Sequence, residues 1–429
     1  MGKTSSLFGL ARQRKQVDQN AIPLARKNDL ILALDFGTTF SGVAYVYRHH
    51  GVVSRSTDIN NIRSWPGDGD SNHKAPTRIQ YLPHSDSKFK WGYEVNPLDD
   101  HIFGLKLLFD PDQPKPYDVT DICADPLNLP KPIEEVAADL MRALYNHATN
   151  MICTSIAADE IELDKLYEKQ YVITVPAVWS DKAKQLTFEA AKKAGVYPLD
   201  LITEPEAAAL YTLDWMKGKG LKERNAVVIC DAGGGTVDLV TYEVDQLEPL
   251  RLTPLTASTG AVAGSVAIDA RFQEEVAKTV GSTQFMALKT TKAYRAAMRE
   301  FDVNVKQAFR GLDDDDVYVT FPTAQLPDNP AMGLESNTMA FSAKRIADMF
   351  EPTINTIVDL VRSQIKSASE ASEGRCQVRF VFLVGGFGSN EYLRRKLEES
   401  IPKVKIVQPE AARKAVMMYA QFPSCMDIG

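Results

Sequence analysis

The stretch that decides the fold is residues 226–244, AVVICDAGGGTVDLVTYEV, where an apolar run meets an aspartate, a glycine-rich turn and a second apolar run. Residues 30–47, LILALDFGTTFSGVAYVY, repeat this order with Asp35 and a Gly/Thr turn. Each stretch predicts two buried strands joined by a tight turn. Two copies of one pattern indicate an internal duplication, and therefore two similar halves.

Helix and strand patterns alternate through the rest of the chain. The expected helices are 133–152, 181–194 (with Ser180 as its cap), 267–279, 292–309 and 391–399, and the expected strands are 171–175, 317–321 and 380–384. This alternation predicts an α/β fold. Residues 60–74 are rich in turn formers and predict an exposed loop. The four aspartates 313–316 fit a solvated loop better than a cation site, because they lack a spaced ligand pattern.

Composition limits the classes of protein to be considered. A chain of 429 residues exceeds what one hydrophobic core usually serves, so we expect two lobes. The net charge of −7 argues against nucleic acid as a partner. We expect neither a transmembrane segment nor a secretory leader, because the apolar runs are too short. The five scattered cysteines contain no Cys-x-x-Cys pair and favour a reducing compartment, the cytoplasm.

Residues 1–28 form a polar, basic segment that we expect to be a disordered tail. Its first residues, MGKTSS, fit the N-myristoylation pattern, which would attach the chain to membranes through Gly2. The pattern is short and permissive, so an accidental Gly2 in an unmodified tail is the alternative interpretation.

Turns of glycine and threonine expose successive backbone N–H groups, and such concave nests bind phosphate oxygens. An aspartate at the end of the preceding strand can hold Mg²⁺ through the water molecules that the ion retains. A third glycine turn, Gly385–Ser389, follows the expected strand 380–384. Neither a Walker P-loop nor a Gly-x-Gly-x-x-Gly turn leading into a helix occurs. The sequence therefore predicts a polyphosphate site between two strand–turn–strand units.

The motifs resemble, in the same order, those of the seventy-kilodalton heat-shock family. The matching segments are 34–41 (first phosphate motif), 173–177 (first-lobe strand and proline), 203–209 (helix crossing between lobes), 231–238 (second phosphate motif) and 384–389 (adenosine motif). The variants at 177–179 and 386–389 are most similar to the divergent "twelve" subgroup. The resemblance covers roughly residues 30–408. It implies a two-lobed, actin-like ATPase fold of duplicated ribonuclease-H-like domains, with a nucleotide cleft between the lobes.

The resemblance also implies roles for the matched residues. Asp35 and Asp231 would hold hydrated Mg²⁺, and Glu204 and Asp231 would orient or activate the attacking water. Lys106 would face the γ-phosphate, although an ordinary lysine of an amphipathic helix is an equal alternative. The implied catalytic residues are Lys106, Glu204, Asp231 and Asp238. The implied contacts to ATP or ADP are Thr38, Thr39, Gly233, Gly234, Gly235, Thr236, Lys306, Gly385 and Gly386.

The chain departs from the family at the adenosine end of the site. Gln307 stands where a second cation is expected, Ser389 replaces an arginine that stacks on adenine, and 264–267 lacks an acidic pair. These departures place adenine affinity and selectivity in question.

We expect a tail at 1–28, a first lobe at 29–203 with a subdomain insertion at about 50–150, a second lobe at 204–408 and a degenerate or truncated crossing helix at 409–429. In that last segment Lys414 stands where the family has a glycine, so its long side chain would disturb a close crossing of helices. The alternative is that this helix packs at the surface and the lysine is solvated. The remaining length, which ends at Gly429, predicts that a peptide-binding domain is absent.

Three functions are compatible with this sequence. The first is a chaperone-like, weakly active Mg-dependent ATP hydrolase whose lobes close on nucleotide and which has possible protein clients or co-chaperones. The second is an interaction module that binds nucleotide without hydrolysis, which the altered adenosine motif supports. The third is a small-molecule kinase of the same superfamily, which the motifs at 173–177 and 203–206 disfavour. Phosphate release without an added acceptor separates the first from the third, and tight ATP binding without turnover selects the second.

Overall fold

The computed structural model describes residues 28–49, 58–85, 87–111, 113–114, 129–216, 218–247 and 250–409. The basic segment through residue 27, Gly2 and the expected crossing helix around Lys414 lie outside these residues, so those predictions stay open. None of the helices in the described ranges is long and apolar enough to cross a membrane.

The first lobe is built on a sheet with the strand order β3-β2-β1-β8-β9, to which β4 adds by pairing with β2. Its strands are β1 (Asn28–Asp35), β2 (Phe40–Arg48), β3 (Asn60–Asn61), β4 (Ala75–Pro76), β8 (Tyr167–Val175) and β9 (Leu199–Thr203). The expected hairpin is confirmed, because β1 pairs antiparallel with β2. The strands β1, β8 and β9 run parallel. Parallel strands buried on both faces need continuous apolar runs, which β1 supplies from Leu30 to Leu34.

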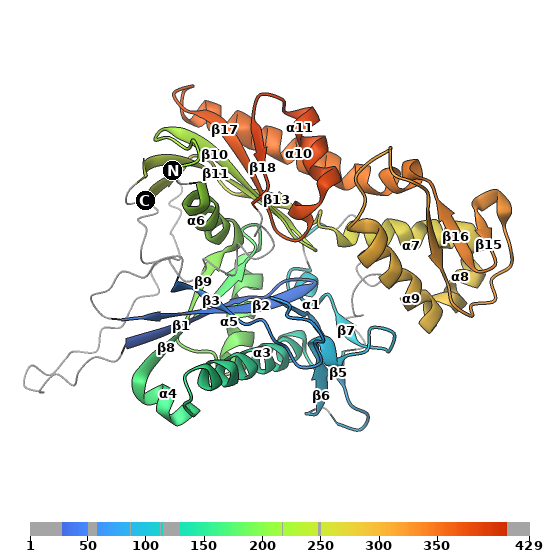
Figure 1. Cartoon of the computed structure of the whole chain (residues 1–429), viewed down its shortest axis with the longest axis horizontal. Helices are drawn as coiled ribbons and strands as arrows, with labels where there is room; N and C mark the ends of the chain where they lie inside the picture. Colours follow the sequence, from blue (N-terminus) through green and yellow to red (C-terminus); the bar gives the residue numbers. More distant parts are fainter. Residues whose placement is uncertain are drawn as a thin grey trace, which may run out of the picture.

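The second lobe repeats this topology. Its sheet has the order β12-β11-β10-β17-β18, with β13 paired to β11. The strands are β10 (Asn225–Ala232), β11 (Val237–Leu247), β12 (Leu250–Pro254), β13 (Thr259–Ala261), β17 (Gln377–Val384) and β18 (Lys405–Val407). Again the first two strands are antiparallel, and β10, β17 and β18 are parallel. The duplication expected from the sequence is therefore present, and the chain has the two-lobed, actin-like ATPase fold (Figure 1).

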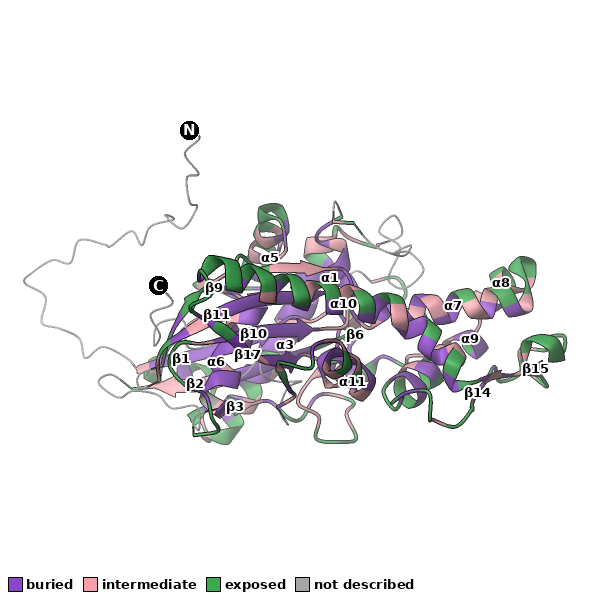
Figure 2. Cartoon of the chain, turned by 90° about the horizontal axis from the view of Figure 1, so that it is seen from above, coloured by how far each residue is buried: buried purple, intermediate pink, exposed green. Residues whose placement is uncertain are grey.

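Helices cover the outer faces of both sheets. The first lobe carries α1 (Leu105–Leu108), α3 (Ile133–Ser155), α4 (Glu160–Leu166) and α5 (Asp181–Lys193), and the second carries α10 (Ala343–Ala371) and α11 (Glu391–Ser400). Figure 2 shows that the central strands β1, β10 and β17 are mostly buried, whereas α10 exposes its outer side. Ser180 caps α5 as expected, since its hydroxyl accepts a hydrogen bond from the Ala183 N–H.

The helix α6 (Glu204–Met216) lies between the two sheets, as Figure 1 shows. Its apolar residues share one core with β1, β8 and β9 on one side and with β10, β11 and β17 on the other. The small residues Ala207, Ala208 and Ala209 are fully buried in this core. Because alanine side chains are short, both sheets can approach the helix axis closely.

Two smaller units extend the lobes on one side of the molecule (Figure 1). The first comprises β5 (Arg78–Tyr81), β6 (Phe89–Trp91), the short 3-10 helix η3 (Gly92–Glu94) and β7 (Ile102–Phe103). The second comprises α7 (Val266–Val280), α8 (Ser282–Lys289), α9 (Lys292–Glu300), the π-helix η5 (Phe301–Lys306), β14 (Val317–Thr320), η6 (Pro330–Met332), β15 (Leu334–Glu335) and β16 (Thr338–Phe341). Lys292 Nζ of the second unit lies 2.6 Å from Asp99 Oδ1 of the first.

Three features differ from the sequence expectations. The expected helix 292–309 changes at Phe301 from α-helix to the π-helix η5, which ends at Lys306. The long helix α10 was not expected, and it continues through Pro352, a residue that usually ends a helix. The loop 60–74 is not uniformly exposed, because Ile62 and Trp65 are buried.

The close approach of α7 to the second glycine turn gives a stability prediction. A Cβ atom built on Gly264 would lie 2.2 Å from the Gly234 carbonyl oxygen, so Gly264→Ala must displace backbone. We expect a loss of about 1–3 kcal/mol of unfolding free energy, measured by urea denaturation. Gly69→Ala is the control, because nothing lies within 4 Å of its Cβ position, and it should change stability by less than about 0.5 kcal/mol. Equal effects of the two changes would contradict the packing described here.

Candidate functional site

A cavity of about 860 Å³ lies between the two lobes, where the first, second and third glycine turns meet. Every predicted site residue except Asp238 lines it. They are Asp35, Thr38, Thr39, Lys106, Glu204, Asp231, Gly233, Gly234, Gly235, Thr236, Lys306, Gly385 and Gly386. Asp238 is buried with 1% of its surface exposed, and it lies across from Asp231 in the β10–β11 hairpin. The fold therefore gathers into one place residues that are far apart in the sequence.

The first and second turns face one another across this cavity. A Cβ atom on Gly235 would lie 2.5 Å from Thr38 Oγ1, and one on Gly234 would lie 2.8 Å from the Thr39 side chain. Only glycine permits this approach, because any larger residue would overlap the threonines. Threonines of the first turn and glycines of the second thus line a shared space, a composition suited to binding phosphate oxygens.

Lys106 and Glu204 form a buried ion pair beside the turns. Lys106 lies on the short helix α1, and Glu204 is the first residue of α6. The start of α6 is fixed locally, because Glu206 Oε2 accepts hydrogen bonds from the Thr203 N–H at 2.9 Å and the Thr203 hydroxyl at 2.6 Å. These two hydrogen bonds tie the residue before Glu204 to the first turn of α6 and so help to fix the position of Glu204.

Glu204, Asp231 and Asp238 are held in an environment that disfavours their charge. Burial raises the pKa of Glu204 to about 7, although Lys106 lowers it. Burial also raises the pKa of Asp231 well above its ordinary value, and Glu204, Asp238 and Asp35 add to the effect while Lys74 opposes it. Burial raises the pKa of Asp238, against the hydrogen bond that Oδ1 accepts from the Val178 N–H at 3.1 Å. Asp238 Oδ2 has no hydrogen-bond partner within the described ranges.

For Lys106, burial lowers the pKa, but the attraction of Glu204 and Asp35 outweighs this effect and the pKa is raised. Its ammonium also lies 5.6 Å from the centroid of the Trp179 ring. The alternative that Lys106 is an ordinary surface lysine of an amphipathic helix is wrong, because the residue is only 5% exposed and points into the cavity.

The charges in this part of the site do not balance. Four carboxylates (Asp35, Glu204, Asp231, Asp238) face two ammonium groups (Lys74, Lys106), so four negative charges less two positive ones leave an excess of two when all are ionised. The described residues contain no group of three or more His, Cys, Asp or Glu side chains that could hold a metal ion directly.

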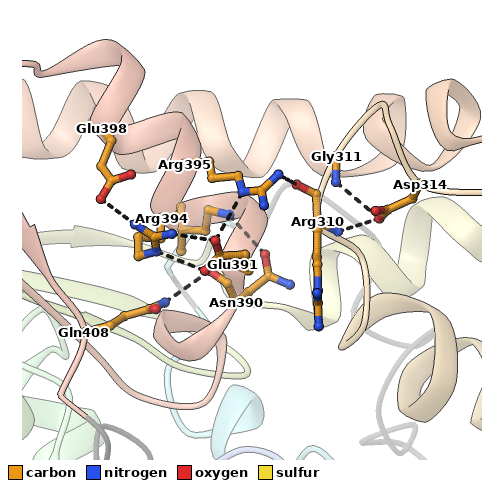
Figure 3. Close-up of polar contacts among 10 residues, drawn as sticks. Arg310, Gly311, Asp314, Asn390, Glu391, Arg394, Arg395, Glu398 and Gln408 are labelled. Carbon is orange, nitrogen blue, oxygen red and sulfur yellow. Dashed lines mark hydrogen bonds and ion pairs between the residues drawn. The ribbon is translucent and has the colours of Figure 1, made fainter.

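The third turn lies against the second lobe's aspartate. Gly385 has a φ of +85°, and a Cβ atom there would lie 2.3 Å from Asp231 Oδ1. Figure 3 shows the polar network behind this turn, in which Gln408 Nε2 donates to the Asn390 carbonyl at 3.2 Å. Gln408 Nε2 also donates to the Gly388 carbonyl at 2.7 Å. Asn390 Oδ1 accepts from the Leu393 N–H at 3.0 Å and so caps α11. The C-terminal part of the turn is therefore tied to the start of α11 and to Gln408.

Lys306 reaches the same end of the cavity, but its ammonium is occupied. It lies 2.6 Å from Asp269 Oδ2 on α7 and 2.7 Å from Asp302 Oδ1 on η5. Burial raises the pKa of Asp269 to about 7, and Lys306 lowers it. Gln307 and Ser389, the two departures from the family, also line the cavity here. These residues give the adenosine end of the cavity a polar lining that differs from the one expected for the family.

Sequence reasoning missed Lys74, which lines the cavity with its Nζ 2.5 Å from Asp35 Oδ2. Nothing in a turn-rich segment distinguishes an inward lysine from a solvated one. It also missed Gln408 and Asp269. Asp269 could have been found by looking for an acidic residue close to segment 264–267, where the acidic pair of the family is missing.

Comparison with known proteins gives a consistent result. The family model described as "Hsp70 protein" matches residues 134–406. The chain is 24% identical to "Heat shock 70 kDa protein 12A" of Mus musculus over 473 residues, which cover 89% of this chain and 67% of that protein. It is 24% identical to "Heat shock 70 kDa protein 12B" of Homo sapiens over 502 residues, 93% of this chain and 69% of that protein. A 112-residue stretch, 26% of this chain, is 38% identical to 15% of "Chaperone protein dnaK" of Phaeodactylum tricornutum.

The raised pKa of Glu204 predicts a pH-dependent effect of Glu204→Gln. Since the folded pKa of about 7 exceeds the ordinary value of 4.5, unfolded chains release this proton first as the pH rises, and the folded state loses stability across that interval. Glutamine does not ionise. The melting temperature of Glu204→Gln relative to the unchanged protein should therefore rise by a few degrees between about pH 5 and about pH 8.

The control is Glu168→Gln, which alters an exposed carboxylate in the same lobe and should show no such trend. A constant difference between Glu204→Gln and the unchanged protein at every pH would mean that Glu204 acts only as the ion-pair partner of Lys106.

Proposed function

This chain belongs to the Hsp70 protein family, and on that premise we propose that it binds ATP between its lobes and hydrolyses it slowly with Mg²⁺. Family membership supports nucleotide binding in general. One observation carries the finer proposal. Two facing glycine turns, each preceded by an aspartate, line a single cavity with a buried lysine–glutamate pair. Such a site can hold phosphates and also position a water molecule beside them.

The residues present fit the proposed cofactor. Asp35 and Asp231 would hold the hydrated Mg²⁺, and Thr38, Thr39 and the second turn 233–236 would hold the phosphates. A divalent cation held beside these carboxylates would favour their ionised form, which burial disfavours. When bound, Mg²⁺ neutralises charge on the phosphate oxygens and so makes the terminal phosphorus easier to attack.

In the proposed mechanism the protein mainly positions the reactants and neutralises their negative charge. Glu204, whose pKa is about 7, can accept the proton of the attacking water near neutral pH. The water oxygen then forms a bond to the γ-phosphorus as the bond to the bridging oxygen breaks, which releases ADP and phosphate. Lys106 keeps Glu204 oriented and places a positive charge where negative charge gathers in the transition state.

A second candidate function is nucleotide binding without useful turnover, and the residues at the adenosine end of the cavity favour it. There Lys306 is already held by Asp269 and Asp302, so it has less freedom to contact a nucleoside.

We propose further that nucleotide closes the lobes, that the protein is cytoplasmic, and that it acts as a chaperone-like partner of other proteins. Phosphate release without an acceptor tests hydrolysis against both the binding-only and the kinase alternatives.

Nucleotide should stabilise the folded chain. At a Mg-ATP concentration of about one hundred times Kd, the unfolding free energy should rise by about 2.7 kcal/mol, which corresponds to a melting-temperature increase of several degrees. Small-angle scattering should show a more compact particle if the lobes close. No change in either measurement at millimolar Mg-ATP would exclude the ATP site.

Lys106→Ala should lower the rate of phosphate release by about 100-fold, since it removes a charge that acts in the transition state. Asp231→Asn should lower both turnover and its dependence on Mg²⁺ concentration. Lys403→Ala, which alters an exposed lysine of the second lobe, is the control and should hydrolyse ATP at the parental rate. Parental turnover in Lys106→Ala would show that Lys106 has no catalytic role.

A further inference from the structure

Lys74 places a positive charge at the phosphate end of the cleft. Its Nζ atom lies 2.5 Å from Asp35 Oδ2, the carboxylate that the proposed function assigns to the cation. The two ammonium groups at the phosphate end of the site, those of Lys74 and Lys106, differ in access. The Lys106 side chain is 6% exposed and paired to Glu204, whereas the Lys74 side chain is 21% exposed. Lys74 therefore borders the open part of the cavity.

The backbone around Lys74 is fixed to the first phosphate turn. Ala75 in β4 pairs with Ser41 in β2, directly after the turn. The Thr77 N–H donates to the Thr39 carbonyl at 2.8 Å, and the Tyr93 hydroxyl donates to the Lys74 carbonyl at 3.1 Å. These contacts fix the backbone of Lys74 and of the residues that follow it. The position is built into the strand pairing and does not depend on a loose loop.

An ammonium group has three N–H donors and no acceptor, so a lysine bonded to one carboxylate oxygen can still donate to a second anion. A phosphate held by Thr38, Thr39 and the glycines of the second turn would lie in the same cavity as Lys74. We propose that Lys74 is a resident cation of the phosphate site. It contacts the terminal phosphates while hydrogen-bonded to Asp35, and the chain consequently binds nucleoside triphosphate with a reduced requirement for a divalent cation.

This inference rests on the proposed function, and it differs from a purely structural role for the Lys74–Asp35 pair. A structural ion pair would affect binding equally with and without a divalent cation. A resident cation matters most when no other cation neutralises the phosphates.

The test is isothermal titration calorimetry of ATP binding to the full chain, in Mg²⁺ and in EDTA. The unchanged protein should lose less than about tenfold in affinity when EDTA replaces Mg²⁺. Lys74→Met should lose a further tenfold to hundredfold in EDTA, the range expected for a hydrogen bond between charged groups, and clearly less in Mg²⁺. Lys74→Arg keeps the charge and should retain binding in EDTA. Lys88→Met alters an exposed lysine of the same lobe and should behave as the unchanged protein.

Lys74→Met leaves Asp35 without its lysine, so its melting temperature is measured first. Where that variant does not fold, the double variant Asp35→Asn/Lys74→Met removes both charges and is used for the EDTA arm, with Asp35→Asn as its reference. Loss of all binding by the unchanged protein in EDTA would overturn the inference, and so would equal losses for Lys74→Met in the two conditions. Absence of binding even in Mg²⁺ would overturn the proposed function, and this inference with it.

Discussion

The packing of α6 between the two sheets is the contact on which the site depends. The helix is buried almost all round, and its three consecutive alanines let strands of both lobes share one core with it. Apolar contact of this kind sets the distance between β1 and β10, and hence the distance between the turns that follow them. Because Glu204 begins the same helix, one element both joins the lobes and carries a carboxylate into the cleft. A change in the α6 core would therefore alter the geometry of the site without touching any residue that lines it.

The cleft differs from the rest of the core because charged side chains are buried there. Carboxylates are rarely buried without full compensation, yet Asp35, Glu204, Asp231 and Asp238 are all 8% exposed or less. The surrounding apolar cores supply the stability that such a cluster costs. Raised pKa values at Glu204 and Asp231 are the direct sign of this departure, and clusters of this kind are typical of functional sites.

The sequence predicted the parts of the fold that follow from local pattern. Apolar runs ending at Asp35 and Asp231 led to the two hairpins, and the motif at 203–209 led to α6. It did not predict what depends on tertiary contacts. The helix α10 passes through Pro352 because its apolar face is held by the second sheet, and Lys74 is turned inward by strand pairing that no local pattern reveals. Lys306 was expected to contact the nucleotide, but Asp269 and Asp302 reach it because α7 and η5 pack together.

The two halves share a topology, but they are no longer equivalent. In the first hairpin the residue opposite the aspartate is Gly42, whereas in the second it is Asp238. The lysines at the phosphate end, Lys74 and Lys106, both come from the first half. At the phosphate end the first half thus supplies both lysines, whereas three of the four carboxylates, Glu204, Asp231 and Asp238, belong to the second half. Two copies of either half would therefore repeat the sheet topology but not this charge pattern, because each half holds charged residues that the other lacks.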